Sequence, residues 1–472
     1  MKLINKIFLR GSAGIVIQSL LLFLTINILS LLGLFIYMPR AIFYFEYALV
    51  LFLIIYFNKP KLAYVVFVII LLLDFFDAFS SVYLFNVFEF LRNFKYLFLY
   101  KISFFQILMV LVFILALIII YKLIIKLNDS IQVNKKVALK TMLLVYAIIF
   151  VLDLLNGSNK ITDNHSSWKI TNKNIASFIT KNYIYYFEQL FSINANKVTK
   201  YSEPSPVFKY LKNDNTNSEM VIIVESWGLI NDSLIRNQVR QFINQKIVEK
   251  GFTFNWGMTS FSGSTTSAAL KQFLNLKGYY NYFLNKTSLS TGDSSLFDIK
   301  NTQGYHTAGF HSYTGKMFAR STWWPNIGMQ NVYFRENYLA EHLNEPNSIQ
   351  EESPFPAIKD ELMFDYLLNK TRGPQKEFAY FLTVNSHLPF RYKTATIYPT
   401  LTNQINNLQI SDEAKSQLMF IYEQLYYYID KLAKSKFKRI IIMGDHVPPY
   451  ININDRHFYN DQNVPYLYLR KD

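Results

Sequence analysis

The first third of the chain consists of long apolar segments separated by short polar ones. No charged residue lies between Gly11 and Met38, and this run exceeds the ~20 residues that a helix needs to cross the hydrocarbon core of a bilayer. Further apolar segments follow at Ala41–Phe57, Leu62–Tyr83, Ile102–Tyr121 and Thr141–Leu155. A cleaved signal peptide explains the pattern less well, because the first run is too long and more runs follow. We therefore expect residues 1–156 to form a polytopic α-helical membrane domain of about five spans.

The basic residues between these segments predict the orientation of the chain. With the N-terminus inside, the inner loops contain Lys2, Lys6, Arg10, Lys59, Lys61, Lys122, Lys126, Lys135, Lys136 and Lys140. The outer loops contain only Arg40, Arg92, Lys95 and Lys101. Cytoplasmic loops carry the excess of Lys and Arg, so this distribution favours an N-terminus inside. An odd number of spans then predicts a multi-pass protein of the plasma (inner) membrane, whose residues after about 157 are extracytoplasmic or periplasmic.

Some features of the membrane-proximal region leave alternatives open. Asp74 and Asp77 are three residues apart and share a helix face. Carboxylates inside a membrane are a hint of function, although a position at the end of a span, in contact with water, also explains them. Phe85–Tyr100 fits an amphipathic helix on the outer membrane surface or an ordinary loop. Residues 157–217 are polar and predict a linker, with an aromatic interfacial helix at Ile175–Ile193.

From residue 218 the pattern changes to short apolar runs that alternate with segments of helical periodicity. The apolar runs are Met220–Val224, Thr307–Phe310, Phe378–Val384 and Ile440–Met443. Leu234–Lys250 has helical spacing, and Ser411 is a suitable N-cap for a later helix. Strands that alternate with helices predict, for residues 218–472, an α/β domain with a mostly parallel central sheet covered on both faces.

Composition excludes several classes of protein. Of the 472 residues, 51% are hydrophobic and 17% are charged, which is too apolar for a disordered chain. The net charge of +15 lies largely in the predicted inner loops, so we expect no nucleic-acid partner. The chain has no Cys, which excludes disulfides, thiolate metal sites, a Cys nucleophile and any sulfatase whose working residue is made from Cys.

Carboxylates and imidazoles follow four of the predicted strands. Glu225, His311, His387 and the pair Asp445-His446 come directly, or within three residues, after an apolar run. The carboxyl ends of parallel strands meet at one edge of a sheet, where α/β proteins bind their ligands. Four such strand ends predict a metal or phosphate site at this edge.

A hydroxyl-rich segment precedes another predicted helix. Phe261–Leu276 contains several Ser and Thr residues and then apolar residues at helical spacing, with the helix starting near Thr266 or Ser267. The free N–H groups at a helix N-terminus attract anions, and a metal-activated hydroxyl there can attack phosphorus. An ordinary Ser/Thr N-cap after a glycine turn explains the same pattern.

Four patches together resemble the alkaline phosphatase/sulfatase superfamily. They are Val221–Gly228, Gly263–Leu270, Gly304–His311 with Phe318-Ala-Arg320, and Asn385–Pro389 with Gly444–His446. Within the superfamily, the chain is most similar to the membrane-anchored phosphoglycerol transferases such as lipoteichoic acid synthase, with the phosphoethanolamine transferases as related enzymes. Spans followed by an outer α/β domain are also the layout of that branch. The resemblance implies an alkaline phosphatase-like, sulfatase-like catalytic domain over residues 218–472.

The resemblance also implies roles for individual residues. The implied ligands of one divalent metal, zinc or manganese, are Glu225, Thr266, Asp445 and His446. Thr266 is the implied nucleophile, and Thr265 is the second candidate because Leu270 stands where the family usually has an acidic residue. The residues implied to hold the phosphate-bearing headgroup are His311, Phe318 and Arg320. His387 is implied to lie near the substrate, where it can protonate the leaving group.

The function implied by the resemblance is headgroup transfer. The enzyme would move phosphoglycerol or phosphoethanolamine from a membrane phospholipid to a glycan or glycolipid acceptor through a phospho-threonine intermediate. The absence of Cys favours phosphoglycerol, because the phosphoethanolamine enzymes generally carry disulfides. One alternative is a membrane-tethered phosphodiesterase or sulfatase-type hydrolase, although a Cys/Ser-x-Pro-x-Arg element is missing. A catalytically inactive glycan-binding module is another.

Overall fold

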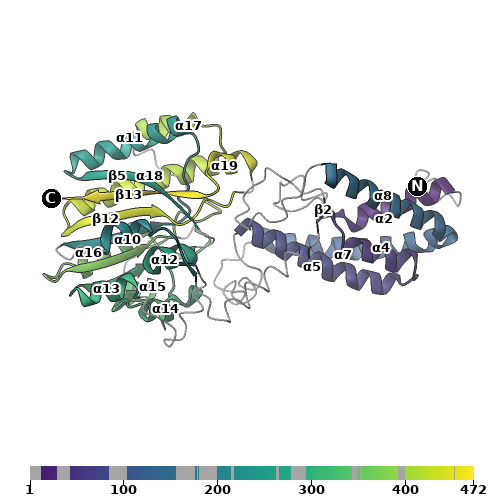
Figure 1. Cartoon of the computed structure of the whole chain (residues 1–472), viewed down its shortest axis with the longest axis horizontal. Helices are drawn as coiled ribbons and strands as arrows, with labels where there is room; N and C mark the ends of the chain where they lie inside the picture. Colours follow the sequence, from purple (N-terminus) through teal and green to yellow (C-terminus); the bar gives the residue numbers. More distant parts are fainter. Residues whose placement is uncertain are drawn as a thin grey trace. The chain divides into compact units, whose positions relative to one another are not determined.

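The computed structural model forms two compact units, Met1–Leu91 with Ile102–Gln189 and Arg92–Lys101 with Leu190–Asp472 (Figure 1). The described residues are 12–28, 43–83, 104–155, 176–177, 179, 199–213, 217–261, 265–277, 294–342, 348–350, 353–391, 399–450 and 452–471. Phe85–Tyr100 and most of Ile175–Ile193, where the sequence leaves open or predicts surface helices, lie outside these residues. The predicted domain boundaries at 156 and 217 stay predictions.

In the first unit, a helix lies at each of the five apolar segments. These helices are α2 (Ser12–Ile26), α4 (Tyr47–Ile55), α5 (Pro60–Tyr83), α7 (Phe104–Ile131) and α8 (Lys135–Leu155), with the 3-10 turn η2 (Gln132–Asn134) between the last two. The short strands β1 (Phe43–Tyr44) and β2 (Ala176–Ser177) pair in parallel. Among the described residues, the helical stretch Val110–Leu155 is long and apolar enough to cross a membrane, and α2 is a shorter apolar helix. The count of five spans stays a prediction.

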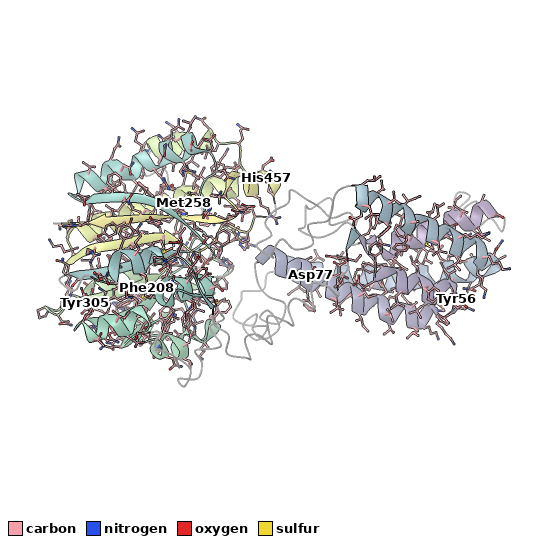
Figure 2. The ribbon with its side chains drawn as sticks, in the orientation of Figure 1. Tyr56, Asp77, Phe208, Met258, Tyr305 and His457 are labelled. Atoms are coloured by element: carbon pink, nitrogen blue, oxygen red, sulfur yellow. The ribbon has the colours of Figure 1, made fainter. Side chains whose placement is uncertain are left out.

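The two carboxylates of the third apolar segment are buried in the first unit. Figure 2 labels one of them, Asp77, on α5. Asp74 and Asp77 are 1% and 2% exposed, respectively. The Tyr47 hydroxyl donates to Asp74 Oδ2 at 2.8 Å, and the Tyr44 hydroxyl donates to Asp77 Oδ2 at 3.1 Å. The pair therefore connects α5 to the β1–α4 region, and neither carboxylate lies at a position open to water.

The second unit is built on a seven-stranded sheet with the order β5-β13-β12-β4-β11-β7-β8. Its strands are β4 (Ser218–Val224), β5 (Thr253–Ser260), β7 (His306–His311), β8 (Asn331–Tyr333), β11 (Glu377–Leu382), β12 (Phe437–Gly444) and β13 (Asn463–Arg470). The neighbours β12, β4, β11, β7 and β8 are parallel, and β13 is antiparallel to both β12 and β5. All residues of β4 are buried, as expected for a central parallel strand covered on both faces. The predicted mostly parallel α/β domain is confirmed.

Helices connect these strands, and local signals mark where several of them begin. The longer ones are α11 (Ser233–Glu249), α12 (Thr265–Leu274), α16 (Asp360–Lys370), α17 (Pro399–Asn406) and α18 (Asp412–Ala433). Ser411 caps α18, as predicted, by accepting the N–H of Ala414. The shorter elements are β3 (Thr199–Lys200), α10 (Pro206–Leu211), β6 (Leu276–Lys277), α13 (Leu296–Thr302), η4 (Met317–Ala319), α14 (Arg320–Asn326), α15 (Arg335–Glu341), β9 (Ile349–Gln350), β10 (Ala357–Ile358) and α19 (Ile453–Phe458).

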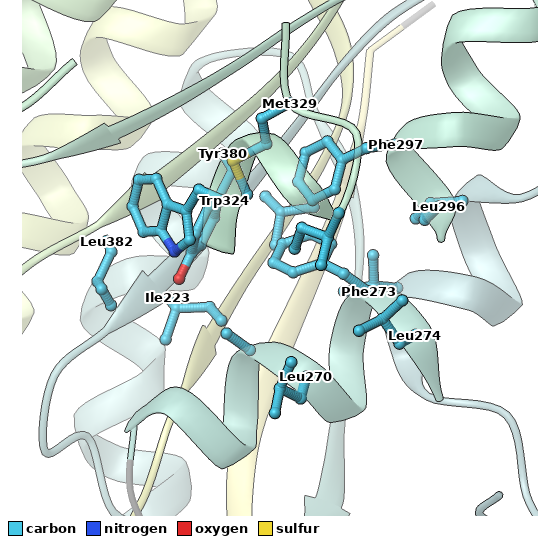
Figure 3. Packing of buried hydrophobic residues seen from close by; sticks show 14 of the residues in the cluster. Ile223, Leu270, Phe273, Leu274, Leu296, Phe297, Trp324, Met329, Tyr380 and Leu382 are labelled. Carbon is cyan, nitrogen blue, oxygen red and sulfur yellow. The ribbon is translucent and has the colours of Figure 1, made fainter. Parts of the chain in front are cut away.

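Large apolar side chains fill both faces of the sheet. On one face, Phe273 of α12 and Trp324 of α14 pack on Tyr380 of β11, with ring centroids 4.7 and 5.1 Å from the Tyr380 ring (Figure 3). On the other face, Phe381 of the same strand packs against Tyr428 of α18 at 5.9 Å. Each such side chain contributes roughly 1.5–3 kcal/mol by leaving water. This packing makes the sheet a rigid platform for the groups at its carboxyl edge.

Candidate active site

The strand order brings the predicted site residues to one edge of the sheet. Val224 of β4 pairs with Gly444 of β12, and Leu382 of β11 pairs with His311 of β7. The other predicted strand-end residues follow these positions directly or within a few residues: Glu225, Asp445, His446 and His387. Because β12, β4, β11 and β7 are adjacent and parallel, their carboxyl ends deliver these groups side by side.

Glu225, Asp445 and His446 form a compact cluster. Each residue offers one ligand atom, and these atoms lie within 4.8 Å of one another. His446 Nε2 is 3.1 Å from Glu225 Oε1 and 3.4 Å from Asp445 Oδ2. The two carboxylates are almost fully buried, at 4% and 0% exposure. Two buried carboxylates at this spacing repel each other unless a cation or a shared proton lies between them.

The donor set fits a divalent metal ion. His446 Nδ1 lies 3.0 Å from the carbonyl oxygen of Val447 and donates to it, which leaves the Nε2 lone pair facing the two carboxylates. Without a metal, these carboxylates raise the pKa of His446 to about 10 and favour a proton at that position. Bonds of about 2.0–2.1 Å in tetrahedral geometry put ligand atoms roughly 3.3 Å apart, close to the observed separations. Carboxylate and imidazole ligands suit zinc or manganese.

The neighbouring threonines occupy different positions relative to this cluster. The Thr265 hydroxyl donates to Asp445 Oδ2 at 2.8 Å and to Glu225 Oε2 at 3.1 Å. Thr266 is also buried, at 3% exposure. Helix α12 begins at Thr265, one residue before the predicted start. These contacts bring Thr265, the second candidate, beside the two carboxylates, and the choice of Thr266 as the nucleophile stays a prediction.

Backbone groups hold Asp445 in its orientation. Its Oδ1 accepts the N–H of Ser226 at 2.8 Å and the N–H of the next residue, His446, at 2.7 Å. This leaves Oδ2 facing Thr265. Ser226 has a φ of 54°, a left-handed conformation that is uncommon for a residue with a side chain. In this conformation, the turn after β4 places the Ser226 N–H where it donates to the Asp445 carboxylate.

Arg320 and His311 form a second group of the site. Both are buried, and Arg320 Nη1 donates to His311 Nε2 at 3.3 Å. His311 Nδ1 lies 3.0 Å from the carbonyl oxygen of Leu382 and carries the proton. Burial, together with the charge of Arg320, lowers the pKa of His311 well below its usual value, so the imidazole is neutral. The Arg320 guanidinium lies over the Phe318 ring at 5.1 Å. The headgroup-binding role of these residues stays a prediction.

His387 lies in the loop after β11, close enough for the Glu225 charge to affect it. Its Nδ1 is 2.5 Å from the carbonyl oxygen of Leu388, and its ring packs edge-on against Phe355 at 4.7 Å. Burial lowers the pKa of His387, and the Glu225 charge opposes this effect. The neutral form with a proton on Nδ1 has a free lone pair at Nε2. His387 is thus ready to accept a proton, and the predicted donation to a leaving group requires that it first be protonated.

The structure also reveals site-supporting residues that the sequence patterns did not indicate. Lys271 of α12 donates to Ser260 Oγ at 2.8 Å and anchors the helix of the threonines to β5. Asp360 and Ser312 are buried and hydrogen-bonded beside the strand ends. Asp360 begins a helix and Ser312 follows a strand, which are common places for such residues. No local signal separates them from ordinary capping and turn residues.

The parallel sheet carries two carboxylates, an imidazole and a helix-borne hydroxyl at its carboxyl edge, which is where α/β enzymes bind their ligands. The sulfatase family matches residues 220–467, more than half of the chain, and the chain belongs to this family. This confirms the resemblance to the alkaline phosphatase/sulfatase superfamily and its implication that the chain is an enzyme. A comparison with curated protein sequences found no match.

Several solved structures are similar to this chain. The lipoteichoic acid synthase LtaP from Listeria monocytogenes has 16% identity and a TM-score of 0.38, over 60% of this chain and 71% of that one. The phosphoglycerol transferase GacH from Streptococcus pyogenes has 14% identity and a TM-score of 0.36, over 56% and 72%. The integral membrane phosphoethanolamine transferase EptA from Neisseria meningitidis has 14% identity and a TM-score of 0.40, over 84% and 75%.

Proposed function

We propose that the protein is a membrane-bound, metal-dependent transferase that moves a phosphoglycerol or phosphoethanolamine headgroup from a phospholipid to a surface glycan or glycolipid. The observation that carries the proposal is the Thr265 hydroxyl, 2.8 and 3.1 Å from two buried carboxylates of the candidate metal centre. A hydroxyl held among metal ligands is an activated nucleophile. The apolar helices of the first unit suit a donor that resides in a bilayer. The Cys-free sequence favours phosphoglycerol.

In the first half of the proposed reaction, the headgroup moves to the enzyme. Glu225, Asp445 and His446 would hold a zinc or manganese ion, whose charge would favour the alkoxide of Thr265 and polarise the phosphoryl group. Thr265 Oγ1 forms a bond to phosphorus as the bond from phosphorus to the diacylglycerol oxygen breaks. The threonine proton is released to water, and protonated His387 gives its proton to the leaving oxygen. The products are diacylglycerol and a phosphodiester on Thr265.

In the second half, the acceptor receives the headgroup. An acceptor hydroxyl forms a bond to phosphorus while neutral His387 takes its proton at Nε2, because the contact of Nδ1 with the carbonyl oxygen of Leu388 favours a proton on Nδ1. The bond from phosphorus to Thr265 breaks, and Thr265 regains a proton from water. Arg320, held by the neutral His311, donates hydrogen bonds to the phosphoryl oxygens in both halves. His387 ends protonated, ready for the next donor lipid.

The test uses the full chain in vesicles with headgroup-labelled phosphatidylglycerol or phosphatidylethanolamine, zinc or manganese, and a glycolipid acceptor. We expect diacylglycerol release and label on the acceptor. T265A should lower the rate by more than about 10³-fold, while T266A, the matched control, should stay within a few-fold of wild type. Mass spectrometry should find the headgroup phosphate on Thr265. A modified Thr266, or a fully active T265A enzyme, contradicts the assignment.

The same experiment separates the other functions. Label recovered only as free headgroup phosphate identifies a hydrolase, in which water replaces the acceptor in the second half. No release from either lipid, together with no metal in the purified protein, identifies an inactive binding module.

A further inference from the structure

Asp360 is a fully buried carboxylate that receives several hydrogen bonds from neighbouring strand ends. Its Oδ1 accepts the Ser312 hydroxyl. Both of its oxygens lie 3.2 Å from the N–H of Val384, and Oδ2 accepts the N–H of Asn385 at 2.8 Å. In return, the Asn385 side-chain oxygen accepts the N–H of Asp360 at 2.7 Å. The contact between Asp360 and the loop after β11 is therefore reciprocal.

These bonds connect the two histidine-bearing segments of the site. Ser312 directly follows His311 at the end of β7, and Val384 and Asn385 lie three and two residues before His387 after β11. The next residue, Ser386, donates to the backbone carbonyl oxygen of Glu225 at 2.6 Å. One carboxylate on α16 thus links both histidine segments, while its described hydrogen bonds reach none of the metal-binding side chains.

We infer that Asp360 is a positioning residue that holds His311 and His387 in the mutual geometry needed for headgroup transfer. The inference rests on the proposed function, in which His387 moves protons and His311 orients Arg320. Misplacing a reacting group by about 1 Å costs on the order of 10²-fold in rate. Loss of the carboxylate leaves two buried N–H groups without their acceptor, so the loop that carries His387 shifts. The contacts among the side chains of Glu225, Asp445 and His446 are made without Asp360.

The experiment compares D360A, D360N and S312A in the full-length protein, with D365N as the matched control. Asp365 lies on the same helix, and its described bonds are to Tyr427 and Lys431 at 2.8 Å. Three quantities are measured: hydrogen exchange of the peptide containing Val384 and Asn385, the Kd for zinc or manganese, and kcat at a temperature where each variant is folded. The first two require no turnover, so they test the positioning even if transferase activity is absent.

In D360A, we expect at least tenfold faster exchange in that peptide, a kcat lower by about 10–100-fold, and a metal Kd within twofold of wild type. D360N retains one oxygen acceptor, so its exchange rate and its kcat should lie between those of D360A and wild type. S312A removes only the link to β7 and should lower kcat with less effect on exchange. D365N should match wild type. Unchanged exchange in D360A overturns the inference, as does a rate loss explained entirely by the unfolded fraction or by weaker metal binding. If D360A does not fold, an S312A enzyme with wild-type kcat overturns it.

Discussion

Gly444 shows how one residue without a side chain permits the candidate metal centre. A Cβ at this position would lie 2.0 Å from the backbone carbonyl oxygen of Trp227, which is closer than non-bonded atoms can approach. Gly444 directly precedes Asp445 and His446, so any shift that relieves this contact moves two metal ligands together. We expect G444A to weaken zinc or manganese binding at least tenfold, within the range seen when outer contacts of a metal site are disturbed, as measured by calorimetric titration.

Gly373 provides the control for this substitution. A Cβ there would meet atoms of the flexible Gln375 side chain, the nearest at 2.5 Å, and these can move aside. G373A should therefore retain wild-type metal affinity. A G444A protein that binds metal as tightly as G373A would show that the strand ends tolerate the shift.

The sequence predicts which carboxylates and which imidazole form this cluster, but it leaves open whether Thr265 or Thr266 lies beside them. Glu225, Asp445 and His446 each follow a strongly apolar strand, so the topology of a parallel sheet is enough to bring them together. The choice between Thr265 and Thr266 depends on where α12 begins, and a run of Ser and Thr residues carries little information about a boundary of one residue. Asp360 was not predicted because its role comes from segments far apart in the sequence.

At the scale of elements, strands with continuous apolar runs were predicted and mixed ones were missed. Strands β4, β11 and β12 are buried in the middle of the sheet and consist largely of apolar residues. Strand β5 at the sheet edge has the sequence Thr-Phe-Asn-Trp-Gly-Met-Thr-Ser, and most of its positions are partly or fully exposed. Edge strands need neither two apolar faces nor a regular alternation of apolar and polar residues. Strand β13 lies inside the sheet, between β5 and β12. It gave no clear signal because its Pro465 argues against a central strand.

An ion pair between α11 and α18 predicts a pH effect on stability. Asp430 of α18 lies 2.7 Å from the Lys250 ammonium and 3.1 Å from that of Lys246, and these hydrogen bonds lower the pKa of Asp430 to about 2. The ionised Asp430 therefore stabilises the fold at any pH above about 3.9, the pKa of an Asp in the unfolded chain. This contribution disappears as the pH falls through the lower pKa of Asp430 in the folded state. We expect D430N to be less stable than wild type at pH 7 by up to about 1 kcal/mol.

The difference between D430N and wild type should shrink as the pH falls from about 4 towards about 2, as followed by denaturation of the full chain. E336Q, which removes an exposed carboxylate from another helix, is the control and should show no such trend. An equal difference between D430N and wild type at every pH would mean that the carboxylate is not stabilised by its charge.

At the scale of the whole molecule, the first unit has a surface unlike that of the second. Apolar side chains on its helices are widely exposed, including Leu111, Leu115, Leu143 and Leu144 at 56–63%. In water, an exposed apolar surface of this extent is unfavourable, whereas hydrocarbon solvates it. The helices satisfy their own backbone hydrogen bonds, as a bilayer requires. This surface supports the proposed membrane location, and the orientation then decides which lipid leaflet the enzyme can use.

The absence of Cys allows a direct test of that orientation. A single Cys placed at Val133, in the turn between α7 and α8, should lie inside according to the positive-inside count, and one at Asn237 on α11 should lie outside. Both positions are exposed, so a membrane-impermeant maleimide can reach either when it is on the accessible side. We expect N237C to react in intact protoplasts or spheroplasts and V133C to react only after permeabilisation, as read by mass shift on a gel. The Cys-free parent reports background labelling in both conditions. Reaction of V133C in intact cells would contradict the predicted inside position of this turn, and failure of N237C to react there would contradict the predicted outside position of the second unit.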